Sequence, residues 1–335
     1  MVGVTSGMVR TAVTPLPPTS ESPILLVGIP RAGTTWSSRV LAAGGSLYPV
    51  MEPDNESRSA PALRAKRRAG RFPVLQPGER DDAFLRLWSW ALDGAPQSPR
   101  LKAAGKILRT VRPHGRRRYF QGRSSPLMQL AGVVGAHPPT GPVPALGTRR
   151  LFVKTVFLPL AVEWLTAAID ADVLILLRHP GNVLASWMKM DMNLEFTRLD
   201  DHPTIRRQIE EKRIPPPGAE PVERMIWNIG VLYSALEEAA ARHPTWLVRT
   251  HEQLCVEPIV KFRCLYEELG LPWNEQVEEY LATTDQPGEG FHTRRVASEQ
   301  PGAWKSRLTP AQIEAVQQVL SGFSLRTWTQ EDFVP

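Results

Sequence analysis

Short apolar runs alternate with longer amphipathic stretches along most of the chain. The run from Ile24 to Ile29 ends at a glycine and a proline, which is typical of a buried parallel strand. Val173 to Leu177 is the clearest such run, and Leu151 to Lys154 and Trp246 to Arg249 are further predicted strands. Because strands that alternate with helices favour a parallel sheet covered on both faces, the pattern predicts an α/β fold.

Helical periodicity predicts the elements between these strands. A first helix begins at Thr34 and is stopped by Gly44-Gly45. Another opens at Pro180, where the missing N–H of proline would be unpaired in any case. Further helices are expected at about 83–92, 158–169, 222–242, 258–269 and 274–282.

Two segments depart from this pattern. Residues 1–21 contain three prolines and no basic start followed by an apolar core, so we expect a disordered leader before a single domain at 22–335. Residues 57–150 are rich in Pro, Arg and Gly and are expected to form a variable insertion that shapes acceptor choice. The basic tract Arg116-Arg117-Arg118 within it fits a solvated loop better than a dedicated anion site.

Composition narrows the class of protein. The formal charge of +6 suits anionic ligands but is weak evidence for nucleic acid. The two cysteines, Cys255 and Cys264, lie in a stretch that reads as helix and form neither a disulfide framework nor a metal-ligand spacing, which favours a reducing cytoplasm. No run of 18 apolar residues predicts a membrane span. Usage rich in Ala, Arg, Pro and Gly points to a bacterial source.

The loop between the first strand and the first helix is the main candidate for binding chemistry. Gly28 to Thr35 fits Gly-x4-Gly-x-Thr, close to the loop of nucleoside triphosphatases, but Thr34 stands where that motif requires Lys. Such enzymes use that Lys to reach the β- and γ-phosphates, so an ATP- or GTP-using kinase or hydrolase is the alternative rather than the first choice. Backbone N–H groups, the helix dipole and Arg31 can instead hold one diester-like phosphate.

The segment Pro30-Arg31-Ala32-Gly33-Thr34-Thr35-Trp36 resembles the 5′-phosphosulfate loop of sulfotransferases that use 3′-phosphoadenosine 5′-phosphosulfate (PAPS). Bacterial, Golgi and tyrosylprotein members of this family often carry Arg-x-Gly-Thr-Thr at this place. The resemblance implies a P-loop-like sheet, with the 5′-phosphate held by Arg31, Gly33, Thr34 and Thr35. It also implies that Ala32 belongs to the same cofactor site and that Trp36 lies against the adenine.

A second motif supports the first. Leu177 to Trp187 resembles the family's 3′-phosphate element, in which Arg178 closes a strand and Ser186 follows eight residues later. The strand delivers Arg178 to the carboxyl edge of the sheet, and Ser186 lies about two turns along the next helix. The two side chains can therefore meet one phosphate, onto which an arginine forks with two hydrogen bonds.

A third stretch, Gly302 to Thr309, resembles the family's C-terminal Gly-x-Trp-Lys segment, and Arg294-Arg295 precede it. The resemblance implies that basic residues here close over the nucleotide, without deciding which of Arg294, Arg295 and Lys305 touches it. It covers about residues 22–56 and 151–320 and leaves 57–150 unassigned.

Sulfuryl transfer requires a base for the acceptor, a cation for the transferring group and a cation for the departing phosphate oxygen. Arg31 suits the departing oxygen, and Lys154 suits the sulfuryl oxygens. Glu52 follows the first helix, as the glutamate base of tyrosylprotein members does, and is the predicted base. Asp54 and Glu56 are weaker rivals. The histidines that could replace it, as in cytosolic members, are His114, His137 and His179, of which His179 is expected to be structural.

No metal is expected, because side-chain cations can neutralise the leaving group. A nucleotide-sensing or nucleic-acid-binding module is a second alternative, but it requires a basic, aromatic stripe that only residues 100–123 resemble. The expected partners are PAPS or its product PAP and a small-molecule or carbohydrate acceptor. An apolar acceptor wall could be formed by Met188, Met190, Met192 and Phe196, although methionine at helical spacing is more often core. The acceptor and the oligomeric state stay open.

Overall fold

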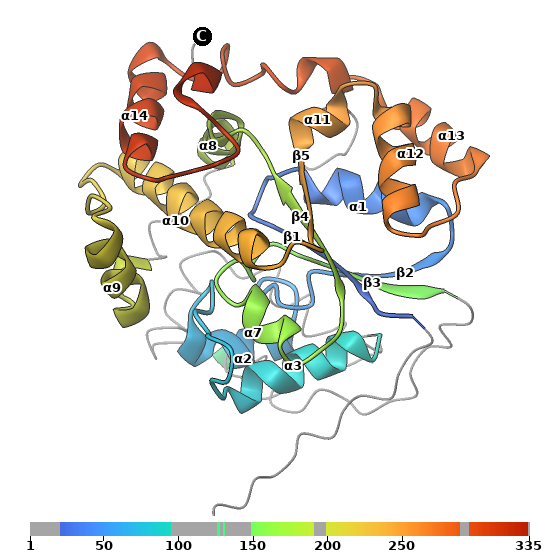
Figure 1. The fold of residues 1–335 in the computed structure, drawn as a ribbon, viewed down its shortest axis with the longest axis horizontal. Helices are drawn as coiled ribbons and strands as arrows, with labels where there is room; N and C mark the ends of the chain where they lie inside the picture. Colours follow the sequence, from blue (N-terminus) through green and yellow to red (C-terminus); the bar gives the residue numbers. More distant parts are fainter. Residues whose placement is uncertain are drawn as a thin grey trace, which may run out of the picture.

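Figure 1 shows the fold in a computed structural model that describes residues 21–94, 126–127, 130, 149–190, 199–288 and 295–333. One sheet has the strand order β2-β3-β1-β4-β5, and every pairing in it is parallel. Its strands are β1 (Ile24–Gly28), β2 (Leu47–Met51), β3 (Arg150–Thr155), β4 (Asp172–Leu177) and β5 (Leu247–Thr250). The predicted parallel α/β fold is confirmed.

Strand β2 is absent from the sequence prediction because Pro49 interrupts its apolar pattern. Proline removes a ladder N–H, which a central strand does not tolerate. The sheet accommodates Pro49 because β2 is an edge strand, which among the described strands pairs only with β3.

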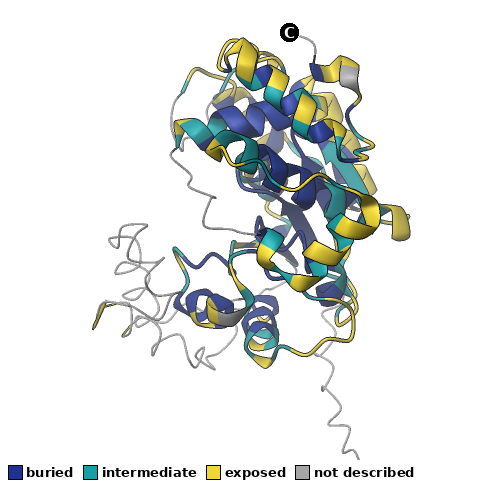
Figure 2. Cartoon of the chain, turned by 90° about the vertical axis from the view of Figure 1, so that its left-hand side faces the viewer, coloured by how far each residue is buried: buried dark blue, intermediate teal, exposed yellow. Residues whose placement is uncertain are grey.

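The alternation of side chains along the strands divides the core into two layers. Ile24 and Leu26 of β1 face one layer, whereas Leu25 and Val27 face the other. The first layer is covered by α1 (Thr34–Ala43), α11 (His251–Cys255), α12 (Pro258–Glu268) and α13 (Glu275–Thr284). The second is covered by α2 (Ala60–Ala69), α3 (Asp82–Leu92), α7 (Val162–Thr166), α8 (Pro180–Lys189), α10 (Pro221–Arg242) and α14 (Pro310–Ser321). Figure 2 shows the buried strands between helices whose outer turns are exposed.

Two predicted helices differ in extent from those observed. The helix expected at 158–169 is reduced to α7, because Pro159 disfavours helical backbone at the residue before it. The helical stretch expected to hold both cysteines is two helices, α11 and α12. The break lies at Glu257, which has φ 50° and precedes Pro258 at the first position of α12.

Helix α2 was not predicted either. Its core-facing positions include Ala62, Ala65 and a fully buried Lys66, so its apolar stripe is weak in the sequence. Ala62 and Ala65, together with Phe84 and Trp88 of α3, belong to the second core layer, so the part of 57–150 nearest β2 packs against the sheet. Predictions that lie outside the described residues are those for the leader at 1–20, His114, Arg116–Arg118, His137, Met192, Phe196 and Arg294.

The remaining elements are η2 (Leu199–Asp201), α9 (Pro203–Lys212), η3 (Ala297–Glu299) and η4 (Gln330–Phe333). Within the described ranges, no helix is long and apolar enough to cross a membrane. All five strands run in one direction, so the residues that follow β1, β2, β3, β4 and β5 gather at the same carboxyl edge of the sheet.

Candidate active site

The loop from β1 to α1 turns sharply at two residues with positive φ. Arg31 has φ 72° and Gly33 has φ 88°. The N–H of Ala32 donates to the carbonyl of Ile29 at 3.1 Å and closes the turn. Gly33 provides no side-chain cap for α1, and the first turn of this helix contains no acidic residue. The positive end of the helix dipole is therefore uncompensated, as it is where helices bind phosphate.

Gly33 is required by a close neighbour as well as by its backbone angle. A Cβ at this position would overlap Cδ2 of His251 and lie 2.8 Å from its Cγ. His251 opens α11, directly after β5, and is buried. Burial, with some repulsion from Arg178, holds the pKa of His251 well below its usual value, so the ring beneath the loop is neutral.

Arg31 joins the two motifs that the sequence places 147 residues apart. Its Nε donates to the hydroxyl of Ser186 on α8 at 2.9 Å. Its carbonyl accepts from a terminal nitrogen of Arg178 at 3.1 Å. The indole N–H of Trp187 also donates to the carbonyl of Pro30 at 2.7 Å. The loop after β1, the residue after β4 and helix α8 therefore form one site.

Arg178 is 8% exposed, and its buried Nε has no partner among the described residues. Its backbone is fixed by Tyr233 of α10: the hydroxyl accepts from the Arg178 N–H at 3.1 Å and donates to the Arg178 carbonyl at 2.7 Å. Burial lowers the pKa of Arg178, and the Glu252 carboxylate opposes that effect. The guanidinium is charged at neutral pH, so a buried donor is available to an anion here.

Glu52 and Lys154 form an ion pair at the neighbouring strand ends. Lys154 is on β3, Glu52 follows β2, and the ammonium donates both to the Glu52 carboxylate and, at 3.4 Å, to the hydroxyl of Thr35. Their side chains are 1% and 12% exposed. Burial raises the pKa of Glu52, but Lys154 and a 2.6 Å hydrogen bond from Asn55 outweigh it, so the pKa lies below the usual value. Glu52 is therefore ionised at neutral pH, as a general base must be.

The two rival carboxylates have other partners. Asp54 is fully buried and accepts from the hydroxyl of Thr155 at 2.6 Å. Glu56 pairs with Lys66 at 3.5 Å and with Arg71 at 3.2 Å. Both point into the second core layer rather than toward the loop after β1, because Thr155 and Lys66 lie on that side of the sheet.

His179 makes structural hydrogen bonds, as expected. Its Nδ1 accepts the N–H of Gly181 and caps α8, so Nε2 carries the proton that is donated to the carbonyl of Asp332 at 3.0 Å. The ring stacks on Trp304 with a centroid distance of 4.6 Å. Burial lowers the pKa of His179 to about 4. The C-terminal segment thus packs on the start of α8, with Lys305 5.6 Å above the Trp304 ring.

The other predicted site residues lie around this centre. Trp36 is half-buried and meets His251 and Phe262 edge-on, at centroid distances of 5.5 and 5.1 Å. Arg295 is close enough to Arg31 that its charge, after burial and Arg178, lowers the pKa of Arg31. Met188 packs against the second core layer, which favours a core position over a place in an acceptor wall.

Glu252 and Asn182 are part of the site that sequence reasoning did not single out. Glu252 accepts from the N–H of His179 at 3.0 Å and from Asn182 at 3.1 Å. Asn182 also donates to the carbonyl of Pro301 at 2.9 Å. The available signal was the capping pattern that begins at Thr250, because a helix start directly after a strand lies at the carboxyl edge of the sheet.

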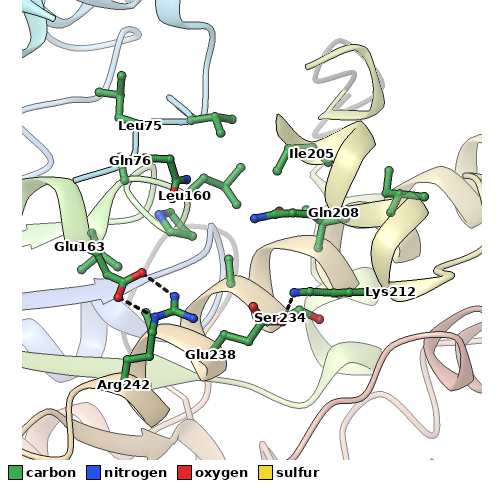
Figure 3. Close-up of a pocket in the computed structure, with 18 of the residues that line it drawn as sticks. Leu75, Gln76, Leu160, Glu163, Ile205, Gln208, Lys212, Ser234, Glu238 and Arg242 are labelled. Carbon is green, nitrogen blue, oxygen red and sulfur yellow. Dashed lines mark hydrogen bonds and ion pairs between the residues drawn. The ribbon is translucent and has the colours of Figure 1, made fainter. Parts of the chain in front are cut away.

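A separate pocket encloses about 690 Å³, part of it open to solvent, and is lined by Leu75, Leu160 and Ile205, with the ion pairs Arg242–Glu163 and Lys212–Glu238 at its sides (Figure 3). Val231 and Ala235 of α10 also line it. Tyr233 lies between these two in sequence and therefore on the opposite side of the helix, where it reaches β4. The pocket and Arg178 are thus on different sides of α10.

A parallel sheet with an uncapped helix start, buried cations and an ionised carboxylate at its carboxyl edge is typical of α/β enzymes that act on phosphorylated nucleotides. The family model described as "Sulfotransferase family" matches residues 23–275. This match spans most of the chain, which therefore belongs to the sulfotransferase family and is a transferase. The kinase or hydrolase alternative is not favoured.

Solved structures of other sulfotransferases resemble the chain. A sulfotransferase domain from the curacin biosynthetic pathway has a TM-score of 0.47 at 14% identity, with 91% of this chain and 99% of that chain covered. A domain of the Synechococcus PCC 7002 olefin synthase has a TM-score of 0.45 at 14% identity, covering 88% and 94%. A mouse sulfotransferase complexed with PAP has a TM-score of 0.39 at 9% identity, covering 93% and 88%. No curated protein matches the chain by sequence.

Proposed function

We propose that this sulfotransferase takes its sulfuryl group from PAPS and delivers it to an acceptor hydroxyl or amine. The observation that carries the proposal is the contact between Arg31 and the two residues of the second motif, Arg178 and Ser186. It brings an uncapped helix start and a buried arginine into one site, as a nucleotide with phosphates at both the 5′ and 3′ positions requires. A nucleoside triphosphate has no 3′-phosphate for the buried arginine to bind.

The residues present fit such a donor. The Nε of Arg178 and the hydroxyl of Ser37 on α1 are buried without a hydrogen-bond partner among the described residues, which is costly unless a ligand meets such groups. In this proposal the first turn of α1, with Gly33, Thr34 and Thr35, holds the 5′-phosphate. Arg178 and Ser186 hold the 3′-phosphate. Ala32, Arg295, Lys305 and Arg294 complete the binding set, and the half-buried Trp36 offers its open side to the adenine.

The three chemical tasks are assigned to the ionised side chains. When bound, PAPS supplies the sulfuryl group and the departing phosphate. Glu52 removes the acceptor proton, because it is ionised and lies beside Lys154. Lys154 can direct its ammonium to the transferring sulfuryl oxygens from a position 3.4 Å from Thr35. Arg31 stabilises the developing charge on the departing oxygen.

The test uses PAPS labelled in its sulfuryl group and a panel of alcohols, phenols, carbohydrates and amines. Labelled product from at least one of them supports the proposal, and the panel identifies the acceptor class. Glu52→Gln should reduce transfer by at least about 100-fold, the usual contribution of a general base, while PAP binding changes little. Unchanged transfer would remove Glu52 from the role of base.

We further propose that residues 22–335 act as one domain, since both core layers share one sheet. A cytoplasmic, bacterial setting is proposed on composition and on two cysteines that are both free.

A further inference from the structure

The turn after β2 holds the end of β3 from both faces of the sheet. Neighbouring strand residues point to opposite faces, so Lys154 and Thr155 do as well. Glu52 accepts from Lys154 on the α1 side, and Asp54 accepts from Thr155 on the α2 side. The backbone N–H of Glu52 also donates to the carbonyl of Lys154 at 2.7 Å. Glu52 and Asp54 thus fix the turn on two consecutive residues of one strand.

The Thr155 hydroxyl both donates and accepts a hydrogen bond at this turn. It donates its proton to Asp54 and accepts the N–H of Phe157 at 3.2 Å. The ring of Phe157 in turn lies 4.1 Å from the Lys66 ammonium, which pairs with Glu56. The turn is therefore anchored at Asp54 and again two residues later.

The contacts of Asp54 and Glu56 hold the turn in an unfavourable backbone conformation. Glu52 has φ 50°, in the left-handed region that costs a residue with a side chain about 1–2 kcal/mol. Such a residue persists only where its surroundings hold it, and such sites are often functional. Asn55 contributes through its N–H, at 3.1 Å from the Glu52 carbonyl, and its amide, at 2.6 Å from the Glu52 carboxylate.

The burial of Asp54 is itself unfavourable for the stability of the fold. It is 0% exposed, and one of its carboxyl oxygens has no partner among the described residues. Burial raises the pKa of Asp54 against the attraction of Lys66, and the nearby Glu52 and Glu56 raise it further. A buried carboxyl group that is incompletely paired destabilises the fold, so a packing role does not explain it.

We propose that Asp54 is a positioning residue for sulfuryl transfer: through Thr155 it holds the turn that places the Glu52 carboxylate against Lys154. The proposal rests on the proposed role of Glu52 as base. It assigns Asp54 no contact with donor or acceptor. Its measurable consequence is that the Thr155 hydroxyl controls the ionisation of Glu52, which lies on the other face of the sheet.

The test compares Thr155→Val, which removes the hydroxyl at nearly constant volume, with Thr155→Ser, which retains it. Glutamate carboxyls labelled with ¹³C are titrated by NMR in the full chain, and the Glu52 signal is identified by its loss in Glu52→Gln. The groups that face Glu52 and stay in place in both variants are Arg31, Asp54, Asn55, Arg58 and Lys154. Affinity for PAP is measured in parallel.

We expect the titration midpoint of Glu52 to rise in Thr155→Val, because Lys154 no longer holds the carboxylate closely, and to stay at the parent value in Thr155→Ser. Asp54→Asn keeps an acceptor for the Thr155 hydroxyl and removes a negative charge near Glu52, so its midpoint should not rise. Asp54→Ala removes the acceptor and should lower transfer as Thr155→Val does, which provides a second comparison if Thr155→Val does not fold. Transfer should fall by about 10- to 100-fold in Thr155→Val, as misplaced catalytic groups do, with PAP affinity within about threefold.

A Thr155→Val protein that melts at a lower temperature but keeps the Glu52 midpoint would overturn the proposal, since that is the result for packing alone. Parent transfer activity in Asp54→Ala would overturn it too. The donor assignment fails separately, by lack of PAP binding in the parent protein, and the base assignment fails by retained transfer in Glu52→Gln.

Discussion

Replacement of Gly33 by alanine tests the structure of the loop after β1. The added Cβ would overlap the His251 ring and also face φ 88°. The backbone cost of a left-handed residue is about 1–2 kcal/mol, and overpacking against a buried ring adds about 1–3 kcal/mol. Since alanine also restricts the unfolded chain, which offsets about 0.4–1 kcal/mol, we expect a net loss of about 1–4.5 kcal/mol.

Gly45→Ala is the matched control. Gly45 has φ 78°, but its nearest neighbour to an added Cβ is the Gln276 side chain at 3.9 Å. It therefore bears the backbone cost without the collision and should lose only about 1 kcal/mol. Urea unfolding followed by tryptophan fluorescence gives both values. PAP affinity should fall in Gly33→Ala alone, because only there must the loop move.

The collision itself is tested by Gly33→Ala combined with His251→Ala. If His251 is the obstacle, the double variant should be more stable than the sum of the single losses predicts. Equal losses in Gly33→Ala and Gly45→Ala, or strict additivity in the double variant, would refute the packing of His251 under the loop.

Two further predictions concern the support of Arg178 and the C-terminal segment. Tyr233→Phe leaves the N–H and carbonyl of Arg178 without their buried partner. The free energy of unfolding should therefore fall by about 2–4 kcal/mol, and PAP should bind more weakly. An unchanged free energy of unfolding in chemical denaturation would contradict this. Burial lowers the pKa of His179 in the folded protein to about 4, against an ordinary value of 6.5, so the folded state favours the neutral ring. The neutral His179 ring therefore stabilises the fold fully above pH 6.5, and this stabilisation is lost as the pH falls toward 4. His179→Asn, which can still cap α8, should show a shallower loss over this range in thermal melts, although His251 contributes to the same window; identical pH slopes would contradict the assignment.

Much of the fold could be predicted because β1, β3 and β4 each contain an uninterrupted apolar run. The elements that were missed have local sequences that oppose their structure. Pro49 disguises an edge strand, and Lys66 disguises a buried helix face whose charge is balanced by Glu56 from another segment. Partners brought in by tertiary structure cannot be read from periodicity.

The sequence could place Arg31 and Arg178 at the carboxyl edge of the sheet because each follows a predicted strand, whereas Glu52 was singled out by its place after the first helix. The sequence could not show that Arg31 bonds to Ser186, nor that Asp54 faces away from Glu52, because both depend on the strand order. His251 and Glu252 also follow a strand, but the order β4-β5 that brings them beside Arg178 appears only in the folded sheet.

The most direct test of the account is the affinity of the protein for PAP compared with adenosine 5′-phosphate and ATP, by calorimetry in the parent protein, in Arg178→Ala and in the surface control Arg263→Ala, whose arginine pairs with Glu278. A hydrogen bond to a charged group contributes about 1.5–3 kcal/mol, so PAP should bind about 10- to 100-fold more tightly than adenosine 5′-phosphate. Arg178→Ala should abolish that preference and Arg263→Ala should keep it. ATP binding as tight as PAP binding, or a preference for PAP that survives in Arg178→Ala, would contradict the proposed donor site.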